Sequence, residues 1–340
     1  MYHLAIIGFG TVGQGLAELL LKKEDQLSEQ YGFEARVVAV SDLLKGAVYD
    51  PDGLDLATLM ETVQGGGRVD DYPGGTKGWD SERTIRETNA NVIVEVTYTD
   101  VKTGEPALSH CRAAFEAGKH VVTTNKGPVA LAYRELNDLA AAHGVQFRFE
   151  GTVMSGTPVI RLAQNGLAGA TILGFRGILN GTTNYILSQM EAGQSYEEAL
   201  KQAQELGYAE AVPDADVEGW DAVGKVVILA NVLMGGDLRI EDVEREGITG
   251  ITEDDVAAAR AAGERWKLIG SGCWADGQVV ARVQPVRLNL SDPLAGVSGP
   301  TNAVTFETDT LGDVTLVGPG AGRTATGYAL LGDLLDIHES

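Results

Sequence analysis

The sequence has 340 residues, of which 26 are Lys or Arg and 48 are Asp or Glu, so its formal net charge at pH 7 is −22. This length exceeds what one hydrophobic core usually supports, so two domains are expected, and the 44% share of hydrophobic residues excludes a disordered chain. Because no basic excess exists to displace counterions from phosphates, the charge excludes a general nucleic-acid binder and disfavours an anionic membrane surface.

The charge and the cysteines also indicate the environment of the protein. Ten of the basic residues are lysines and sixteen are arginines. An acidic, lysine-poor surface is typical of a very salty cytosol, where ions screen self-repulsion, and an ordinary acidic protein is the alternative. Cys111 and Cys273 give neither a disulfide framework nor a zinc spacing. With no signal peptide or spanning apolar run in the sequence, a cytoplasmic protein is expected.

The first predicted element is a strand over 3–8 that runs into a glycine-rich turn and an apolar-periodic helix. Strand, G-x-G-x-x-G and helix in this order form the dinucleotide-binding fingerprint, although a purely structural turn is the alternative. The glycines permit the turn, the approach of a pyrophosphate and close helix packing, and the helix N-terminus faces the phosphates. We therefore expect a nucleotide to contact Gly8, Phe9, Gly10, Thr11, Val12 and Gly13.

A second predicted strand, over 35–40, ends at Asp42. An acid at this position usually accepts hydrogen bonds from the adenosine ribose and repels a 2′-phosphate, which favours NAD over NADP. Lys45 and Arg68 lie downstream and can still meet a phosphate, and a turn-capping role for Asp42 is the alternative.

Alternating strands and helices continue to residue 150. We predict strands over 91–96, 120–123 and 145–150, helices over 106–117 and 133–143, and a glycine-rich surface loop over 64–78. The alternation predicts an α/β fold with a doubly wound parallel sheet of the Rossmann type. Lys126 follows the strand over 120–123, at the edge where ligands bind. It can neutralise a carboxylate, contact a cofactor or transfer protons, and a solvated surface lysine is the alternative.

Two segments of small residues follow, FEGTVMSGTP over 149–158 and GILNGTTNYIL over 177–187. The second has an Asn-Gly turn before a helix, which we expect Thr182 or Thr183 to cap. Small residues with free amides and hydroxyls suit an amino-acid carboxylate, and they suit a plain strand-to-helix junction equally.

The densest group of acids lies over 208–225, which reads YAEAVPDADVEGWDAVGK. Asp221 and Lys225 are four residues apart in a helix predicted over 220–233, so they share a face and can pair. This helix is apolar nearly all round, which indicates that the pair is buried or faces a cavity. Burial makes a lysine easier to deprotonate and hence suited to proton transfer, and the neighbouring acids suit a substrate ammonium.

Together these segments resemble homoserine dehydrogenase. The likeness rests on 8–13, 121–130, 149–160, 177–187 and 208–225, and 318–335 (GPGAGRTATGYALLGDLL) is similar to the closing segment of that family. The resemblance implies a Rossmann-type dinucleotide-binding domain over 1–150 and an α+β substrate-binding and dimerisation domain over 151–317. It implies that a helix within 318–340 returns to the nucleotide domain.

The resemblance also implies reversible hydride transfer between NAD or NADP and L-homoserine or L-aspartate 4-semialdehyde, on the route to threonine and methionine. Lys126 and Lys225 would be the active-site lysines, with Lys225 the acid–base group on the alcohol oxygen and Asp221 orienting it. The chemistry agrees, because the hydroxyl must lose its proton as hydride leaves carbon.

Further roles carry over by motif. The substrate ammonium would bind to Glu210 and Asp216, in the neighbourhood of Gly181, Thr182 and Thr183. The cofactor would also contact Thr97, Gly320 and Gly322. A structural Na⁺ or K⁺ would lie on the backbone carbonyls of Glu150, Val153, Ser155 and Thr157. A homodimer through the sheet of the second domain is expected.

The sequence departs from the family pattern at two places. Val212 stands where the family often has an acid, for which Asp214 compensates, and Thr124-Asn125 replaces a pair of small residues before Lys126. Neither touches the proposed proton relay. Because the chain ends soon after the GPGAG segment, we expect a short form without the regulatory domain and without threonine inhibition through it.

Three alternatives compete with this interpretation. A semialdehyde or other amino-acid dehydrogenase of the same architecture is the first, but a semialdehyde dehydrogenase needs a thiol nucleophile, and neither cysteine has suitable surroundings. A non-catalytic nucleotide-binding sensor would have no need of Lys126, Lys225 and Asp221. A purely structural role is disfavoured by acids and lysines on buried helices.

Overall fold

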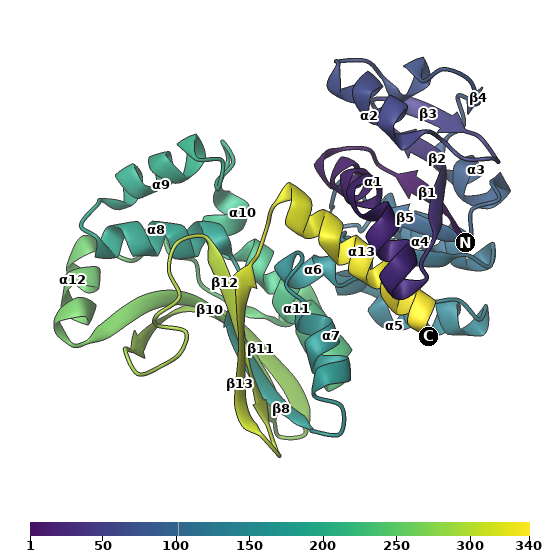
Figure 1. Cartoon of the computed structure of the whole chain (residues 1–340). Coiled ribbons are helices and arrows are strands. Elements are labelled where there is room, and N and C mark those ends of the chain that lie inside the picture. The colour runs from purple at the N-terminus through teal and green to yellow at the C-terminus, as the bar shows by residue number, and fades with distance from the viewer. Residues whose placement is uncertain (101) are drawn as a thin grey trace. The chain divides into compact units, whose positions relative to one another are not determined.

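A computed structural model describes residues 1–100 and 102–340. They divide into two compact units, which we call unit 1 (1–156 and 322–340) and unit 2 (157–321). The sequence places boundaries after 150 and after 317, and the structural division falls a few residues later at both places. Each unit contains its own sheet (Figure 1).

The sheet of unit 1 has the strand order β4-β3-β2-β1-β5-β6-β7. The pairs from β2 to β7 are parallel, and β3 and β4 extend the edge in antiparallel fashion. The predicted doubly wound fold is confirmed. The strands are β1 (Tyr2–Ile7), β2 (Ala35–Asp42), β3 (Gly46–Tyr49), β4 (Thr76–Lys77), β5 (Val92–Glu95), β6 (His120–Thr123) and β7 (Phe147–Arg148).

The helices of unit 1 enclose an apolar core built on the buried strands β1, β2 and β5. They are α1 (Thr11–Tyr31), α2 (Leu56–Gln64), α3 (Ser81–Glu87), α4 (Ala107–Glu116), α5 (Lys126–Ala142), α6 (Gly151–Met154) and α13 (Arg323–Glu339). Helix α13 crosses α1 closely, because a Cβ on Gly327 would lie 2.6 Å from the carbonyl carbon of Gly15. The chain runs from β1 to β2 on one side and reaches β5 on the other, so the ligand crevice of such a fold lies at the carboxyl ends of β1 and β5.

Two local predictions in unit 1 are wrong in extent, and a third is incomplete. Helix α5 begins at Lys126, where Asn125 caps it, but non-helical backbone at Ala132 divides it, so the helix predicted over 133–143 is its second part. The last strand covers Phe147–Arg148 rather than 145–150. The expected loop over 64–78 contains a 3-10 turn, Val69–Asp71, and the short strand β4, which pairs with β3.

The sheet of unit 2 has the order β13-β12-β8-β10-β11-β9, and only the described β11–β9 pair is parallel. The strands are β8 (Ile172–Ile178), β9 (Glu244–Arg245), β10 (Glu264–Ala275), β11 (Gln278–Asn289), β12 (Thr301–Thr308) and β13 (Gly312–Pro319). The helices are α7 (Val159–Arg161), α8 (Gly181–Glu191), α9 (Tyr196–Glu205), α10 (Asp214–Val217), α11 (Trp220–Met234) and α12 (Glu253–Ala261). Helices α8, α11 and α12 pack on β10, and Leu294 and Val297 join a small second core.

Candidate active site

The glycine fingerprint of unit 1 has the geometry that a dinucleotide requires. Gly8 follows β1 with φ +96°, and a Cβ there would lie 2.5 Å from the carbonyl oxygen of Val96. A Cβ on Gly13 would lie 2.5 Å from the carbonyl oxygen of Gly8, so a side chain at either position would block the turn. Gly10 is the N-cap of α1 and offers no side chain, so an anion can approach the first N–H groups of this helix.

Asp42 lies at the end of β2 and is bound to the fingerprint. Its carboxylate accepts hydrogen bonds from the N–H of Phe9 at 2.7 Å, of Lys45 at 2.9 Å and of Leu44 at 3.0 Å. Although burial alone would raise the pKa of Asp42, these backbone hydrogen bonds bring it below its ordinary value. The carboxylate is therefore a fixed negative charge that caps a turn and holds the fingerprint loop, as the turn-capping alternative predicts.

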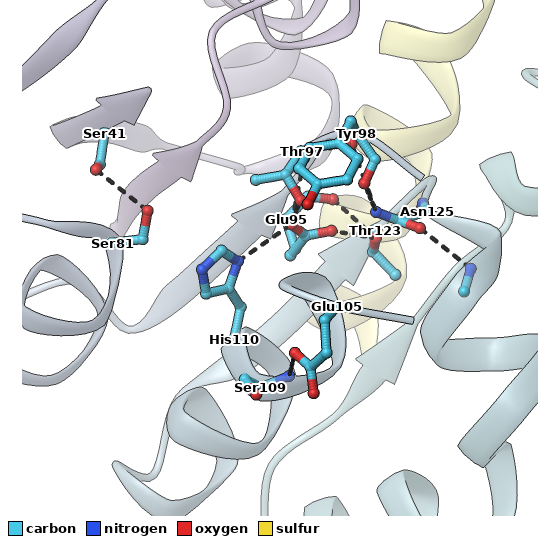
Figure 2. Close-up of polar contacts among 11 residues, drawn as sticks. Ser41, Ser81, Glu95, Thr97, Tyr98, Glu105, Ser109, His110, Thr123 and Asn125 are labelled. Carbon is cyan, nitrogen blue, oxygen red and sulfur yellow. Dashed lines mark hydrogen bonds and ion pairs between the residues drawn. The ribbon is translucent and has the colours of Figure 1, made fainter. Parts of the chain in front are cut away.

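Thr97 and Lys126 follow two neighbouring strands of the same sheet. Thr97 comes after β5, and Lys126 is the first residue of α5, after β6. Asn125 links the two segments, because its amide donates to the carbonyl oxygens of Tyr98 at 3.0 Å and Thr97 at 3.4 Å, while its side-chain oxygen accepts from the N–H of Gly127 (Figure 2). Thr97 and Lys126 thus belong to one hydrogen-bonded region at the ligand-binding edge.

In unit 2, Asn180 organises the start of α8, a role that our sequence analysis missed. Its side-chain oxygen accepts hydrogen bonds from the N–H of Thr183 at 2.9 Å and from the Thr183 hydroxyl at 3.0 Å. The prediction that Thr182 or Thr183 caps this helix is therefore wrong: Asn180 is the N-cap, and the Thr182 hydroxyl donates to the carbonyl oxygen of Tyr208. An asparagine directly before the first helical residue is a recognised capping signal, which could have identified it.

The amide nitrogen of Asn180 joins two carboxylates. It donates to Asp216 at 2.7 Å and to Asp221 at 3.0 Å. Burial and the charge of Asp221 raise the pKa of Asp216 above its ordinary value, because two carboxylates sharing one buried site repel each other. A cation bound beside them would relieve this repulsion.

The pair predicted on α11 is present and largely buried. Lys225 is 7% exposed, and its Nζ lies 2.8 Å from Asp221 and donates at 2.6 Å to the carbonyl oxygen of Leu179. Two of the three positions on the Nζ atom besides its bond to carbon are thus occupied, by acceptors on one turn of α11 and after the end of β8. Neighbouring acids and a lysine in a buried setting can exchange protons with a bound alcohol.

Glu210 does not join this cluster. It is exposed between α9 and α10, where the side-chain amide of Gln204 donates to its backbone carbonyl oxygen at 3.1 Å. Gly181 and Thr182 lie at the start of α8, beside the cluster. Gly320 packs on Asn302 in unit 2, whereas Gly322 is the N-cap of α13 in unit 1.

Two family models match almost the entire chain. One described as "Homoserine dehydrogenase, NAD binding domain" matches residues 8–150, and one described as "Homoserine dehydrogenase" matches residues 158–335. The chain belongs to the homoserine dehydrogenase family. It is accordingly an oxidoreductase with an NAD-binding domain, and the predicted family is confirmed.

Individual homoserine dehydrogenases match over their whole length. An NAD(+)-dependent homoserine dehydrogenase of Pseudomonas canavaninivorans is 50% identical over 340 residues, which cover 100% of this chain and 97% of the relative. A putative homoserine dehydrogenase from Archaeoglobus fulgidus has a TM-score of 0.89 at 38% identity over 99% of both chains. A hyperthermophilic archaeal homoserine dehydrogenase in complex with NADPH has a TM-score of 0.85 at 29% identity, over 99% and 98% of the chains.

The described residues were also searched for a membrane-spanning helix and for a metal site built from side chains. They contain no helix long and apolar enough to cross a membrane. Over the same residues, no group of three or more His, Cys, Asp or Glu side chains could hold a metal ion. Of the residues on whose carbonyls the sequence resemblance implies a cation, Glu150, Val153 and Ser155 belong to unit 1, and Thr157 is the first residue of unit 2. Ser155 has a left-handed backbone, with φ +51°, which turns the chain after α6.

Proposed function

We propose that the protein oxidises L-homoserine to L-aspartate 4-semialdehyde with NAD and also runs the reverse reaction. The observation that carries this proposal is the buried Lys225–Asp221 pair beside Asp216 in unit 2, on the motif that the family model covers. Unit 1 would bind the dinucleotide and unit 2 the amino acid. The products feed the synthesis of threonine and methionine.

Lys225 is the proposed proton acceptor. Its contacts with Asp221 and the carbonyl oxygen of Leu179 fix the Nζ atom, which leaves one position on the nitrogen for the substrate hydroxyl. Asp221 orients the amine and stabilises the ammonium that forms when the hydroxyl proton arrives. The bound nicotinamide supplies the hydride acceptor.

The raised pKa of Asp216 supports a substrate-ammonium site. Two partly buried carboxylates held together by Asn180 lack a full complement of positive charge, and the α-ammonium of an amino acid would supply it. Glu210 is proposed as a second ammonium ligand, which requires its exposed loop to close on the substrate. Gly181, Thr182 and Thr183 would surround the rest of the amino acid.

For the cofactor, we propose a preference for NAD over NADP. Asp42 is a fixed anion at the end of β2, where a 2′-phosphate would meet it, while Lys45, 4.0 Å from its carboxylate, offsets part of the repulsion. The Gly8–Gly13 turn would hold the pyrophosphate. Thr97, Lys126, Gly320 and Gly322 would complete the cofactor contacts.

A thiol mechanism has little support in unit 1. Cys111 is fully buried in α4, and burial raises the pKa of its thiol well above the ordinary value. An activated cysteine nucleophile needs the opposite shift. This favours direct oxidation of an alcohol over the thiol-dependent aldehyde oxidation of a semialdehyde dehydrogenase.

Initial-rate kinetics test the proposal directly. Homoserine should reduce NAD, and NADP less efficiently, in a buffer with low KCl and in one with molar KCl. Binding of NADH without turnover of homoserine would contradict the proposed reaction and favour a nucleotide-binding sensor. Turnover of a different hydroxy amino acid, without turnover of homoserine, would contradict homoserine as the substrate.

We also propose a homodimer through the outer face of the unit 2 sheet, where Val280 and Val317 are 39% and 52% exposed. Light scattering should give twice the mass of 35.9 kDa, and a monomer would contradict the proposal. A nicotinamide dehydrogenase works where its cofactor is recycled, which supports a cytoplasmic location. Nucleic acid and membranes are not expected partners at a charge of −22.

Two ionic proposals complete the assignment. The acidic surface is proposed to be an adaptation to high salt, so the melting temperature should rise between low and molar KCl; equal stability in both would contradict it. A Na⁺ or K⁺ ion is proposed on the carbonyls of Glu150, Val153, Ser155 and Thr157. A melting temperature that rises with millimolar NaCl or KCl, but not with tetramethylammonium chloride, would support that site.

A further inference from the structure

Glu95 is a buried carboxylate at the ligand-binding edge of unit 1 that has no part in the proposed proton transfer. It ends β5 and is 0% exposed. In the sheet register it stands between Ile7 of β1 and Thr123 of β6. Burying a carboxylate is costly unless hydrogen bonds satisfy it, so its partners indicate its use.

The donors around Glu95 converge from three segments (Figure 2). Oε1 accepts hydrogen bonds from the N–H of Thr97 at 3.2 Å and from the Thr97 hydroxyl, and Nδ1 of His110 lies 3.4 Å away. The hydroxyl of Thr123 donates to the carbonyl oxygen of Glu95 at 2.8 Å and lies 3.4 Å from Oε2. The side chain thus holds both donors of Thr97.

The loop over 96–98, in which Thr97 is hydrogen-bonded to Glu95, lies between two parts of the proposed cofactor site. On one side, the N–H of Val96 donates to Ile7 at 2.8 Å, and a Cβ on Gly8 would lie 3.0 Å from the nitrogen of Thr97. On the other side, Asn125 binds the carbonyl oxygens of the loop and caps the helix that begins with Lys126. A shift of Thr97 would therefore also displace the Gly8–Gly13 turn and the start of the helix at Lys126.

The hydrogen bond to Glu95 also fixes what Thr97 can offer a ligand. A hydroxyl has one hydrogen and two lone pairs. Since the hydrogen of Thr97 is committed to the carboxylate, the hydroxyl presents only acceptor positions. An acceptor matches the amide N–H groups of a nicotinamide carboxamide and does not match a carbonyl oxygen.

We propose that Glu95 is a positioning residue for the dinucleotide, which turns the Thr97 hydroxyl into an acceptor for the carboxamide N–H of the nicotinamide. The inference rests on the proposed function only in taking nicotinamide as the cofactor. Replacement of Glu95 by methionine keeps the length of the side chain but removes the oxygen that accepts from both donors of Thr97. The Thr97 hydroxyl can then turn its hydrogen toward the ligand, so it no longer presents only acceptor positions to the carboxamide N–H.

Calorimetric binding of NAD and of its 3-acetylpyridine analogue, whose acetyl group has no N–H, tests the proposal without homoserine. Glu95→Met should raise the Kd for NAD about tenfold, the loss of one good hydrogen bond, and change the Kd for the analogue by less than about twofold. Glu105→Met is the matched control, because this partly exposed carboxylate accepts from the N–H of Ser109 (Figure 2), and both affinities should be retained. Equal losses for both dinucleotides, or no loss for either, would overturn the proposal.

A second pair of variants covers the case in which Glu95→Met does not fold. Thr97→Val removes the acceptor and should give the same selective loss of NAD affinity. Thr97→Ser keeps the hydroxyl and should keep the wild-type ratio between the Kd for NAD and the Kd for the analogue. Equal binding of NAD and the analogue by Thr97→Val, at wild-type affinity, would also overturn the proposal. Because none of these measurements uses the amino acid, a failure of homoserine turnover leaves them interpretable.

Discussion

The Nζ atom of Lys225 lies 2.8 Å from the carboxylate of Asp221, one turn away on the buried helix α11. The same Nζ donates to the carbonyl oxygen of Leu179, so its position is set by two acceptors from different elements. On an exposed helix such a pair contributes only a few tenths of a kcal/mol. At 9% and 18% side-chain exposure, the pair is instead a largely buried charge pair, which makes it a candidate for chemistry.

Lys225→Ala should lower kcat for homoserine oxidation by about 10²–10⁴-fold, because no proton acceptor then faces the hydroxyl. Steady-state kinetics at saturating NAD measure the effect. Lys201→Ala is the control, since this lysine is 77% exposed on α9 of the same unit, and its kcat should be unchanged. A near-normal kcat for Lys225→Ala would reject the proposed role.

Asp221→Asn should act through Lys225 rather than independently. The variant removes the charge that stabilises the ammonium, so kcat should fall while the NAD affinity of unit 1 stays unchanged. In a double-mutant cycle with Lys225→Ala, the combined loss should be close to that of Lys225→Ala alone. Losses that simply multiply would show that the two residues work separately.

Asn180→Ser separates the capping of α8 from the bridging of the two carboxylates. Serine is as good an N-cap as asparagine, so the cap of α8 should be retained. However, serine has no amide that donates to Asp216 and Asp221, so the two carboxylates are no longer held together and the KM for homoserine should rise about tenfold. Urea unfolding and initial rates measure the two effects, and an unchanged KM would show that Asn180 is only a cap.

The sequence predicts the role of a residue when that role depends on its neighbours in the chain, and not when it depends on residues far away in the sequence. The Gly8–Gly13 turn and the Asp221–Lys225 spacing are local patterns, and both were predicted from the sequence. The capping role of Asn180 is also local, but its amide bonds reach residues 36 and 41 positions further along the chain, which no local pattern encodes. Glu95 likewise has the pattern of an ordinary strand end, and only the register with β1 and β6 shows its partners.

Asp42→Ser tests cofactor preference. Removing the fixed anion at the end of β2 should raise the affinity for NADP about tenfold, since like charges no longer face each other. The affinity for NAD should fall, because the N–H of Phe9 loses its 2.7 Å acceptor. Calorimetry with both dinucleotides checks this, with Asp25→Ser on the exposed face of α1 as the control for a change of charge. An unchanged ratio of the two affinities would show that Asp42 serves the turn alone.

Lys267 predicts a pH dependence of stability. This residue of β10 is 1% exposed, and its Nζ donates to the side-chain oxygen of Asn184 at 2.9 Å and to the carbonyl oxygen of Val297 at 2.6 Å. Burial lowers the pKa of Lys267 from 10.5 to about 8. Between these values the unfolded chain holds a proton that the folded protein has released, so the free energy of unfolding should rise with pH from about 8 to 10.5.

The contribution of Lys267 can be isolated with Lys267→Met. Between pH 8 and pH 9.5 the wild type should gain about 2 kcal/mol relative to this variant, since each pH unit in the interval is worth about 1.4 kcal/mol. Urea unfolding at both pH values measures the difference, and Lys201→Met, at an exposed position, should follow the wild type. Parallel curves for wild type and Lys267→Met would mean that Lys267 stays protonated in the folded protein, held by Asn184 and Val297.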